Sequence, residues 1–416
     1  MAIPLSFRAP QDDRRRAAFY AWMAALVILA QLPLVMAIGH RSGPLVVTLA
    51  FAAVMVAAVL DGSLAGIVAS AGRALASPLG LAAMAFFAWA AVSITWSDVP
   101  DTSLAAMAEF GLTVGGVVIL ALALPRRMSR EYGHLVLAGA VAGACVVILI
   151  DLWSGLLMRR VLAVQSDPFI FNRPVVTVLT VSLPVILLLL KRQQNWLAAA
   201  LAALVVVTIL QSESGAAMLG LIAGAAAYAV TRLSRRLALA LAGIGLVAAV
   251  VSAPMIGDIA GRALPPTLHE KLAGSHSVER IEIWKLFGTA VRHEPVIGLG
   301  FGASPRFPET HVAERMRAEN PDLPPAWHPH NAALQVWVEL GAVGAVLGTL
   351  VMLLLLRRFA GLPRSLLTHS MAVLAAVVAI SLVGHGAWQG WWPAAIGAAI
   401  VWLQAAEDID APRETG

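Results

Sequence analysis

The chain has 416 residues, of which 59% are hydrophobic and only 13% are charged. Soluble globular proteins carry roughly 25% charged residues, so a water-soluble fold is excluded and the excess apolar sequence must face lipid. The formal net charge of +5 does not indicate nucleic acid binding, because the arginines form short clusters between apolar runs. The single cysteine, Cys145, excludes an internal disulfide and a cysteine-rich metal site. The composition therefore predicts an all-α integral membrane protein.

The apolar runs set the number of predicted spans, because a membrane-spanning helix needs about 20 apolar residues. The segment 1–16 is polar and ends on arginines, and the apolar run after it is too long for a signal peptide, so we expect a retained first helix. About twelve spans are predicted, near 17–38, 44–60, 79–96, 103–124, 135–158, 174–190, 195–210, 215–231, 237–256, 333–356, 366–384 and 388–405. The shorter stretch 63–72 is expected to lie at the membrane interface.

Arginine and lysine in the short connections predict the orientation, since these residues stay on the cytoplasmic side. One set of helix ends carries Arg8, Arg14, Arg15, Arg16, Arg73, Arg126, Arg127, Arg130, Lys191, Arg192, Arg232, Arg235, Arg236, Arg357, Arg358 and Arg364. The short connections on the opposite side carry only Arg41, Arg159, Arg160 and Arg173. Both termini are therefore predicted to be cytoplasmic. The chain then divides into an N-terminal bundle of about nine helices (1–256), an outer loop (257–332), and C-terminal helices with a cytoplasmic tail (333–416).

The outer loop, which in a bacterium is periplasmic, is predicted to contain two amphipathic helices. Apolar residues recur at helical spacing over 277–292, at Ile281, Trp284, Phe287, Gly288 and Val291. Ser277 fits the N-cap of this helix, and Pro295 follows its end. A second helix is predicted over about 310–319. We expect both helices to cover the outer face of the membrane.

Two histidines and an asparagine stand where the loop enters a membrane helix, in the stretch Trp327-His328-Pro329-His330-Asn331. One interpretation is helix capping by Asn331, with histidines at the interface. The other is a general base, because histidine has an unperturbed pKa near 6.5 and can take a proton at neutral pH. A helix N-terminus disfavours a cation and attracts phosphate, so it would keep His330 neutral beside an anion site.

Four arginines are candidates for binding an anionic head group. Arg280 belongs to the first loop helix, and Arg159, Arg160 and Arg173 lie on the side where cations are rare. Solvation of Arg280 and snorkelling of the other three toward lipid phosphates would explain them without a substrate. A diphosphate is the sharper interpretation, because a planar guanidinium donates two hydrogen bonds at once.

Other features have simpler expected roles. The glycine-rich segment Gly298–Gly302 follows a helix and not a strand, so we expect a flexible turn and no nucleotide site. Glu109 and Asp151 fall inside spans, where structural pairing within the bundle is the favoured interpretation. The tryptophans of 388–392 fall at an outer helix end, where an aromatic belt is expected.

Taken together, the motifs resemble the O-antigen ligase family, whose relatives include O-antigen polymerases and protein O-oligosaccharyltransferases. The resemblance rests on Arg280–Trp284, on Pro295–Gly302, and on His328-x-His330-Asn331 entering a helix that reads Glu339-Leu340-Gly341. It covers the topology of most of the chain and the motifs of about 280–341. The family also tends to have an arginine in a turn between two central helices, and the corresponding turn here, 211–216, has none.

The resemblance implies a membrane glycosyltransferase that joins an O-antigen glycan from undecaprenyl pyrophosphate to lipid A-core in lipopolysaccharide synthesis. It implies no metal ion and no other cofactor, and an active site on the periplasmic side of the bacterial inner membrane. By this analogy His330 is the catalytic base, and the substrate-binding candidates are Arg280, Arg173, His328, Asn331, Arg159 and Arg160. The expected partners are the lipid-linked glycan, the lipid A-core acceptor and membrane lipid.

Two alternatives remain open from the sequence. An O-antigen polymerase would use a second lipid-linked glycan as the acceptor. A transporter of lipid-linked glycans, from a different class of protein, would require polar or broken helices in paired halves. Few such interruptions are evident in the sequence, and its polar residues concentrate on one outer face.

Overall fold

The computed structural model describes residues 13–125, 133–163, 167–263, 277–321, 326–384 and 386–407, and within these ranges it contains helices and no strand. The helices that build the bundle are α1 (Asp13–Ala30), α2 (Leu32–Ile38), α3 (Gly43–Asp61), α4 (Leu64–Leu75), α5 (Pro78–Ser93), α6 (Pro100–Ala123), α8 (Gly133–Trp153), α10 (Asn172–Lys191), α11 (Asn195–Gln211), α12 (Gly215–Leu233), α13 (Arg235–Ser252), α18 (Ala332–Phe359), α19 (Arg364–Ser381) and α20 (Trp391–Glu407). The shorter helices are η1 (Ile94–Trp96), α9 (Leu157–Val161), η2 (Pro168–Phe171), η3 (Ala253–Met255), α14 (Ile256–Ala263), α16 (Ser277–His293), η5 (Ser304–Glu309) and α17 (His311–Glu319).

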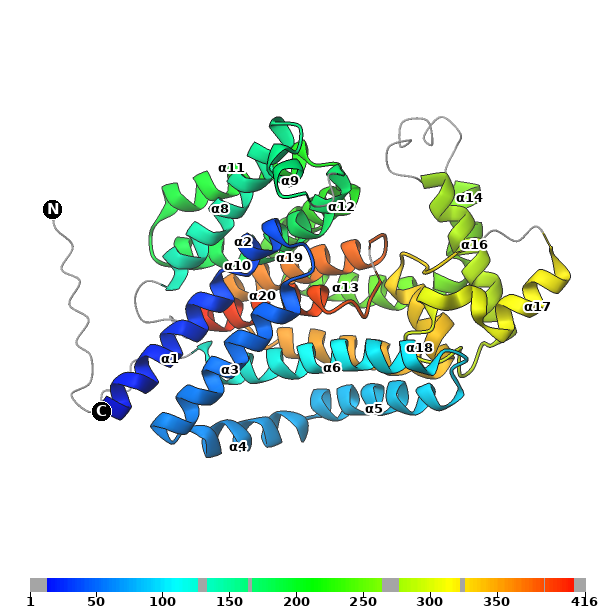
Figure 1. The fold of residues 1–416 in the computed structure, drawn as a ribbon, viewed down its shortest axis with the longest axis horizontal. Coiled ribbons are helices and arrows are strands. Elements are labelled where there is room, and N and C mark those ends of the chain that lie inside the picture. Colours follow the sequence, from blue (N-terminus) through cyan, green and yellow to red (C-terminus); the bar gives the residue numbers. More distant parts are fainter. Residues whose placement is uncertain are drawn as a thin grey trace.

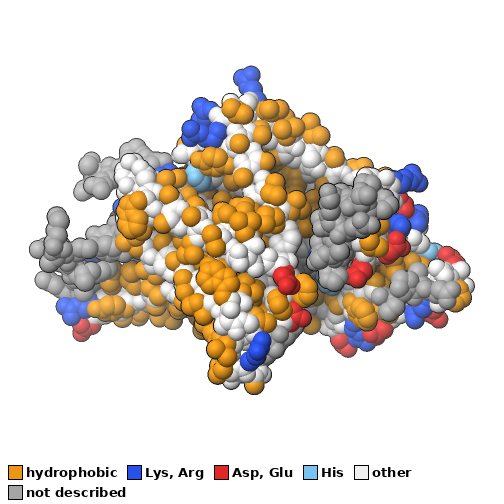
Figure 2. Space-filling model, turned by 90° about the horizontal axis from the view of Figure 1, so that it is seen from above, with side chains coloured by type: hydrophobic (Ala, Val, Ile, Leu, Met, Phe, Trp, Pro, Cys, Tyr) orange, Lys and Arg blue, Asp and Glu red, His pale blue; other side chains and the backbone are white. Residues whose placement is uncertain are grey.

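The bundle is elongated, and α14, α16 and α17 gather at one end of it, which we call the loop end (Figure 1). Hydrophobic side chains cover much of the middle of the face in Figure 2, whereas acidic side chains gather in its right half, toward the loop end. An apolar belt between polar ends is what a lipid-facing surface requires.

The described residues contain nine helices long and apolar enough to cross a membrane, or ten if the bent pair α1 and α2 forms one span. The chain is therefore an all-helical, multi-pass membrane protein, as predicted. The predicted count of about twelve is not confirmed. The two predicted spans outside the ten correspond to α11 and α20, which have 17 residues each. The stretch predicted to be interfacial forms the separate helix α4, in which Ile67 is the one buried residue.

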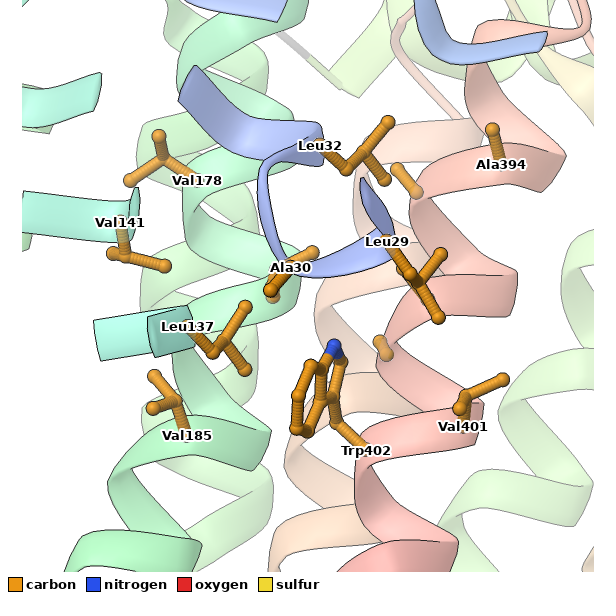
Figure 3. Packing of buried hydrophobic residues seen from close by; sticks show 14 of the residues in the cluster. Leu29, Ala30, Leu32, Leu137, Val141, Val178, Val185, Ala394, Val401 and Trp402 are labelled. Carbon is orange, nitrogen blue, oxygen red and sulfur yellow. The ribbon is translucent and has the colours of Figure 1, made fainter. Parts of the chain in front are cut away.

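The largest core lies where α1, α2, α8, α10 and α20 meet. Figure 3 shows Leu29, Leu137, Val185 and Trp402 converging there from four of these helices. In α10, 78% of the most apolar window is buried, compared with 6% in the span that contains α13. Helix α10 is therefore central in the bundle, while α13 lies on its rim.

Both helices predicted in the outer loop are present, as α16 and α17. Thr310 caps α17, because its side chain accepts a hydrogen bond from the backbone N–H of Ala313. The apolar faces of α16 and α17 pack against η5 and the start of α18, in a core that contains Phe287, Phe307 and Met316. This core fixes the loop helices to the bundle.

Helix α18 is broken at Gly341, whose backbone (φ +64°, ψ −163°) suits only glycine. The backbone groups around the break are bonded by residues 295–302, which we call the inserted segment. Three N–H groups donate across this contact: Leu299 to the carbonyl of Val338, Gly300 to that of Glu339, and Ala342 to that of Pro295, each at 2.9 Å. Free backbone groups are costly inside a membrane, so the inserted segment stabilises the break.

The expectation of a flexible turn at Gly298–Gly302 is wrong. All five residues are buried. Gly298, Gly300 and Gly302 have positive φ, and a Cβ on Gly298 would lie 2.5 Å from the backbone of Glu339. The glycines are needed here for close approach to α18, not for mobility.

The expected aromatic belt is also wrong. Trp388, Trp391 and Trp392 are 8%, 3% and 6% exposed, so they face the protein interior and not lipid. Trp388 packs on Phe110 and Phe301, with ring centroids 5.2 and 4.7 Å away. Trp391 and Trp392 begin α20 and Trp388 lies in the turn before it, but contacts with α5, α6 and the inserted segment direct Trp388 inward.

Candidate functional site

The predicted histidine motif lies at the loop end, where the chain enters α18. Asn331 is the N-cap, as predicted, and its Oδ1 accepts a hydrogen bond from the Leu334 N–H at 3.0 Å. His330, just before the cap, has a positive φ of +49°. This left-handed backbone reverses the direction of the chain before the helix and turns the His330 side chain toward the connection between α19 and α20.

The His330 ring is held in one tautomer. Its Nδ1 lies 3.0 Å from the backbone carbonyl of Gly384. A carbonyl can only accept, so Nδ1 carries the proton and Nε2 keeps its lone pair. Burial lowers the pKa of His330, the hydrogen bond to Gly384 raises it, and the charge of Arg280 lowers it, with a net downward direction. The ring is therefore neutral at neutral pH, with a basic nitrogen available.

His328 stacks beside His330, with the ring centroids 3.9 Å apart. Its Nδ1 accepts a hydrogen bond from the His330 backbone N–H at 3.4 Å, so its proton resides on Nε2. Burial, followed by the charges of His330 and Arg173, lowers the pKa of His328 to about 3. With its lone pair directed at the backbone, His328 has only an N–H to offer a further partner, whereas His330 has a free basic nitrogen.

Arg280 comes from α16 and reaches the same place. Its Nη1 donates to the carbonyl of Val383 at 2.6 Å, and burial lowers the pKa of the guanidinium. One turn further along α16, Trp284 Nε1 donates to the carbonyl of Pro329 at 2.9 Å. Helix α16 is thus bonded to the segments on both sides of His330. The adjacent carbonyls of Val383 and Gly384 hold Arg280 and His330 side by side.

Arg173, at the start of α10, also lies close enough for its charge to reach the histidine pair. Its charge contributes to the lowered pKa of His328, and its guanidinium lies 5.6 Å from the ring centroid of Trp391. No hydrogen bond from the Arg173 guanidinium to another described residue is present. A half-buried cation held over an indole, with its donors free, is suited to an anionic ligand.

Among the described residues, the partners of Arg159 do not include His328 or His330, and the same is true of Arg160. Arg159 is 2% exposed, with its Nε 3.2 Å from Asp151 and its Nη2 donating to the carbonyl of Ala37. Its donors are thus engaged within the bundle, and Asp151 is paired there as predicted. Arg160 is exposed on α9.

Two residues of the site were missed from the sequence. Burial, followed by the charges of Arg173, Arg41 and Arg159, lowers the pKa of His40 to about 4. Arg41 therefore adds to the positive charge around Arg173, and His40 lies among these arginines as a neutral ring. Arg41 could have been found by the same argument that selected the other cations on the sparse side.

A cavity of about 410 Å³ begins next to the histidine motif. Its lining includes Ala332 and Ala333, which follow Asn331, and Leu382, which precedes Val383. From there it runs between α5, α6, α13, α18 and α19 as far as Met352, and its lining is almost entirely apolar. The polar site therefore stands at the end of an apolar cavity that follows α18 into the bundle. In the described part of the chain, no group of three or more His, Cys, Asp or Glu side chains is arranged to hold a metal ion.

Comparison with known proteins finds a family that matches part of this site, since Arg173, Val383 and Gly384 lie outside the matched range. Residues 199–349 match the family model described as O-antigen ligase, a range that includes α16, the inserted segment and the histidine motif. A Rickettsia felis protein named "Putative polysaccharide ligase" is 26% identical over 185 residues, which cover 44% of each chain. Related proteins of Rickettsia conorii and Rickettsia prowazekii are 26% and 27% identical over the same length, covering 44% of this chain and 44% and 45% of their own. The alignments span less than half the length of these relatives.

Proposed function

Because the chain carries an O-antigen ligase domain, we propose that it is a membrane glycosyltransferase that joins an O-antigen glycan from undecaprenyl pyrophosphate to lipid A-core. The observation that carries this proposal is the state of His330, whose Nε2 is free while its Nδ1 is bonded to Gly384. In this proposal the loop end faces the periplasm of a bacterial inner membrane, and α11 and α20 complete twelve spans.

The reaction is a single displacement. Nε2 of His330 takes the proton from an acceptor hydroxyl, and the oxygen attacks the anomeric carbon of the donor sugar. The bond from that carbon to the diphosphate oxygen breaks, and undecaprenyl pyrophosphate leaves from the opposite face, which inverts the configuration. The proton on His330 then passes to the leaving diphosphate or to water. The energy comes from the sugar–phosphate bond, and no metal is required by these steps.

Two arginines whose charges reach the histidine pair support the binding of the diphosphate. The positive charge of Arg280 lowers the pKa of His330, and that of Arg173 lowers the pKa of His328. A diphosphate bound by both arginines would therefore lie beside the base. Fixed cations in a partly buried site stabilise the charge that develops on a leaving phosphate. The family tends to have an arginine in the turn that corresponds to 211–216, where this chain has none. Arg173, whose donors are free, could take the place of that arginine.

The apolar cavity suits the lipid part of the donor. An isoprenoid chain has no hydrogen-bonding groups, and the cavity lining offers almost none. The cavity starts at the polar site and continues into the bundle, so a lipid chain within it would leave its diphosphate at the histidines. This arrangement also supports membrane lipid as the medium from which the donor enters.

The break in α18 does not favour a transporter. Broken helices of transporters line a path for the substrate, whereas the backbone freed at Gly341 is bonded by the inserted segment. The ligase proposal is tested by incubating purified protein with lipid-linked glycan and lipid A-core. Joined product supports the ligase, and longer lipid-linked glycans in the absence of lipid A-core indicate the polymerase. If neither of these products forms, the proposed transfer is refuted.

A further inference from the structure

Glu339 is a fully buried carboxylate surrounded by hydrogen-bond donors. It receives the N–H of Gly302 at 2.5 Å and that of Ser304 at 3.3 Å. Gln335 Nε2 and Trp388 Nε1 donate to it at 2.9 and 2.6 Å. All four partners are donors, so Glu339 is the acceptor in each of these bonds. Glu339 therefore ties the inserted segment to α18 and to Trp388.

The same network reaches the connection that holds the base. Gln335, which donates to Glu339, accepts the N–H of Ala387 on its Oε1 at 2.8 Å. Ala387 and Trp388 belong to the connection between α19 and α20, and so do Val383 and Gly384. Two bonds from α18 thus fix one side of this connection, while its other side presents carbonyls to Arg280 and His330.

The connection is restrained at more than one point, since the N–H of Gly390 also donates to Glu109 on α6 at 2.8 Å. A Cβ on Gly384 would lie 2.5 Å from the carbonyl of Ile380, so glycine is required for the chain to turn there. A carbonyl that orients an imidazole must be held within a few tenths of an ångström, because misplacement of about 1 Å can cost roughly 100-fold in rate. The bonds to Gln335 and Glu339 supply this restraint.

We propose that Glu339 and Trp388 are positioning residues, which hold the Gly384 carbonyl against Nδ1 of His330 by restraining the end of the α19–α20 connection to which Trp388 belongs. Neither touches the reacting atoms. The catalytic consequence rests on the proposed role of His330 as the base, but the positioning itself is a property of the free protein. Loss of the Glu339–Trp388 bond releases Gly384 and allows the proton of His330 to exchange between its two nitrogens.

The test reads the His330 tautomer by ¹⁵N NMR of the full-length protein in detergent, with labelled histidine and the His330→Ala spectrum for assignment. We expect wild type to show the Nδ1–H tautomer alone, and Glu339→Gln and Trp388→Phe to show a mixture of both. Glu339→Gln places an amide donor against other donors, whereas Trp388→Phe removes one bond and keeps the aromatic packing. Trp388→Phe decides the outcome if Glu339→Gln does not fold.

Trp337→Phe is the matched control. It lies on the same helix and loses an indole hydrogen bond of 2.8 Å to Val250, outside the network. We expect it to keep the wild-type tautomer, whereas kcat for glycan transfer should fall up to about 100-fold in the two network variants. An unchanged tautomer in both network variants, or the same mixture in Trp337→Phe, overturns the positioning role. A changed tautomer in a protein whose wild type transfers no glycan refutes the proposed function alone.

Discussion

His330 combines a strained backbone with a fixed ring. A non-glycine residue in the left-handed region costs on the order of 1 kcal/mol, and such strain persists only where the surroundings enforce it. Here the cap Asn331 and the hydrogen bond to Gly384 enforce it on either side. The ring is thereby aimed away from solvent and toward Arg280, which a relaxed loop would not achieve.

The proposed contact of Arg280 with the diphosphate is tested by a change that keeps the charge of this residue. Arg280→Lys should lower kcat/KM for glycan transfer about tenfold or more, because lysine cannot donate to the diphosphate and to Val383 with the same fixed fork. The measurement is steady-state kinetics with purified protein. Arg292→Lys, on the exposed face of the same helix, should retain the wild-type value. Full activity in Arg280→Lys and Arg280→Ala would remove Arg280 from the site.

The charge of Arg280 also sets the pH dependence. Its charge lowers the pKa of His330, so Arg280→Met should raise that pKa. The base works when neutral, and the rate falls as pH drops through this pKa. The acid limb of the rate profile should therefore move to higher pH in Arg280→Met, and a ¹⁵N titration of His330 should show the same direction. If the acid limb stays in place or moves to lower pH in Arg280→Met, Arg280 does not lower the pKa of His330.

The sequence singled out His330, Arg280 and Asn331 as candidates by residue type and by their places near helix ends, and the cap at Asn331 is confirmed. It did not identify Gly384 or Val383, since their backbone carbonyls carry no side-chain signal and Gly384 lies 54 residues from His330. Arg159 illustrates the converse. Its guanidinium could bind a diphosphate, but it is engaged with Asp151 and with the carbonyl of Ala37. The local sequence pattern does not predict these contacts.

At the scale of the elements, the break in α18 requires glycine at position 341. A Cβ at Gly341 would lie 2.2 Å from the carbonyl of Val296, and the backbone there is closed to other residues. Gly341→Ala should therefore destabilise the protein by about 1–3 kcal/mol or more. Gly139→Ala, where a Cβ meets nothing, should be neutral or stabilising by about 0.5–1 kcal/mol. Thermal unfolding in detergent compares the two, and equal midpoints would contradict the inserted segment's role.

The helices of the outer loop and their caps were predictable because hydrophobic spacing and capping are local signals. The inserted segment was not, because its glycines look the same in a flexible turn and in a close backbone contact. Trp388 was wrongly expected to face lipid, since its bond to Glu339 joins residues 49 apart. Tertiary contacts, and not propensity, decide each of these features.

For the whole molecule, the orientation is a prediction that the fold itself does not test. On a Cys145→Ala background, Glu314→Cys on α17 and Gly361→Cys between α18 and α19 introduce single thiols at exposed positions. The arginine bias predicts that an impermeant reagent applied to intact cells labels the first and not the second. Permeabilised cells, in which both should react, are the control. The reverse pattern would place the site on the cytoplasmic side.

The central claim is that His330 takes the proton from the acceptor, and ligation by purified His330→Ala tests it most directly. General base catalysis contributes roughly 10²- to 10⁴-fold, so the variant should lose at least 100-fold in rate. It should still bind the lipid-linked donor, because Arg280 and Arg173 remain, and His328→Ala should be less impaired. Ligation by His330→Ala at the wild-type rate would contradict the claim. If His328→Ala is inactive and His330→Ala is only slow, His328 is the base and the two roles must be exchanged.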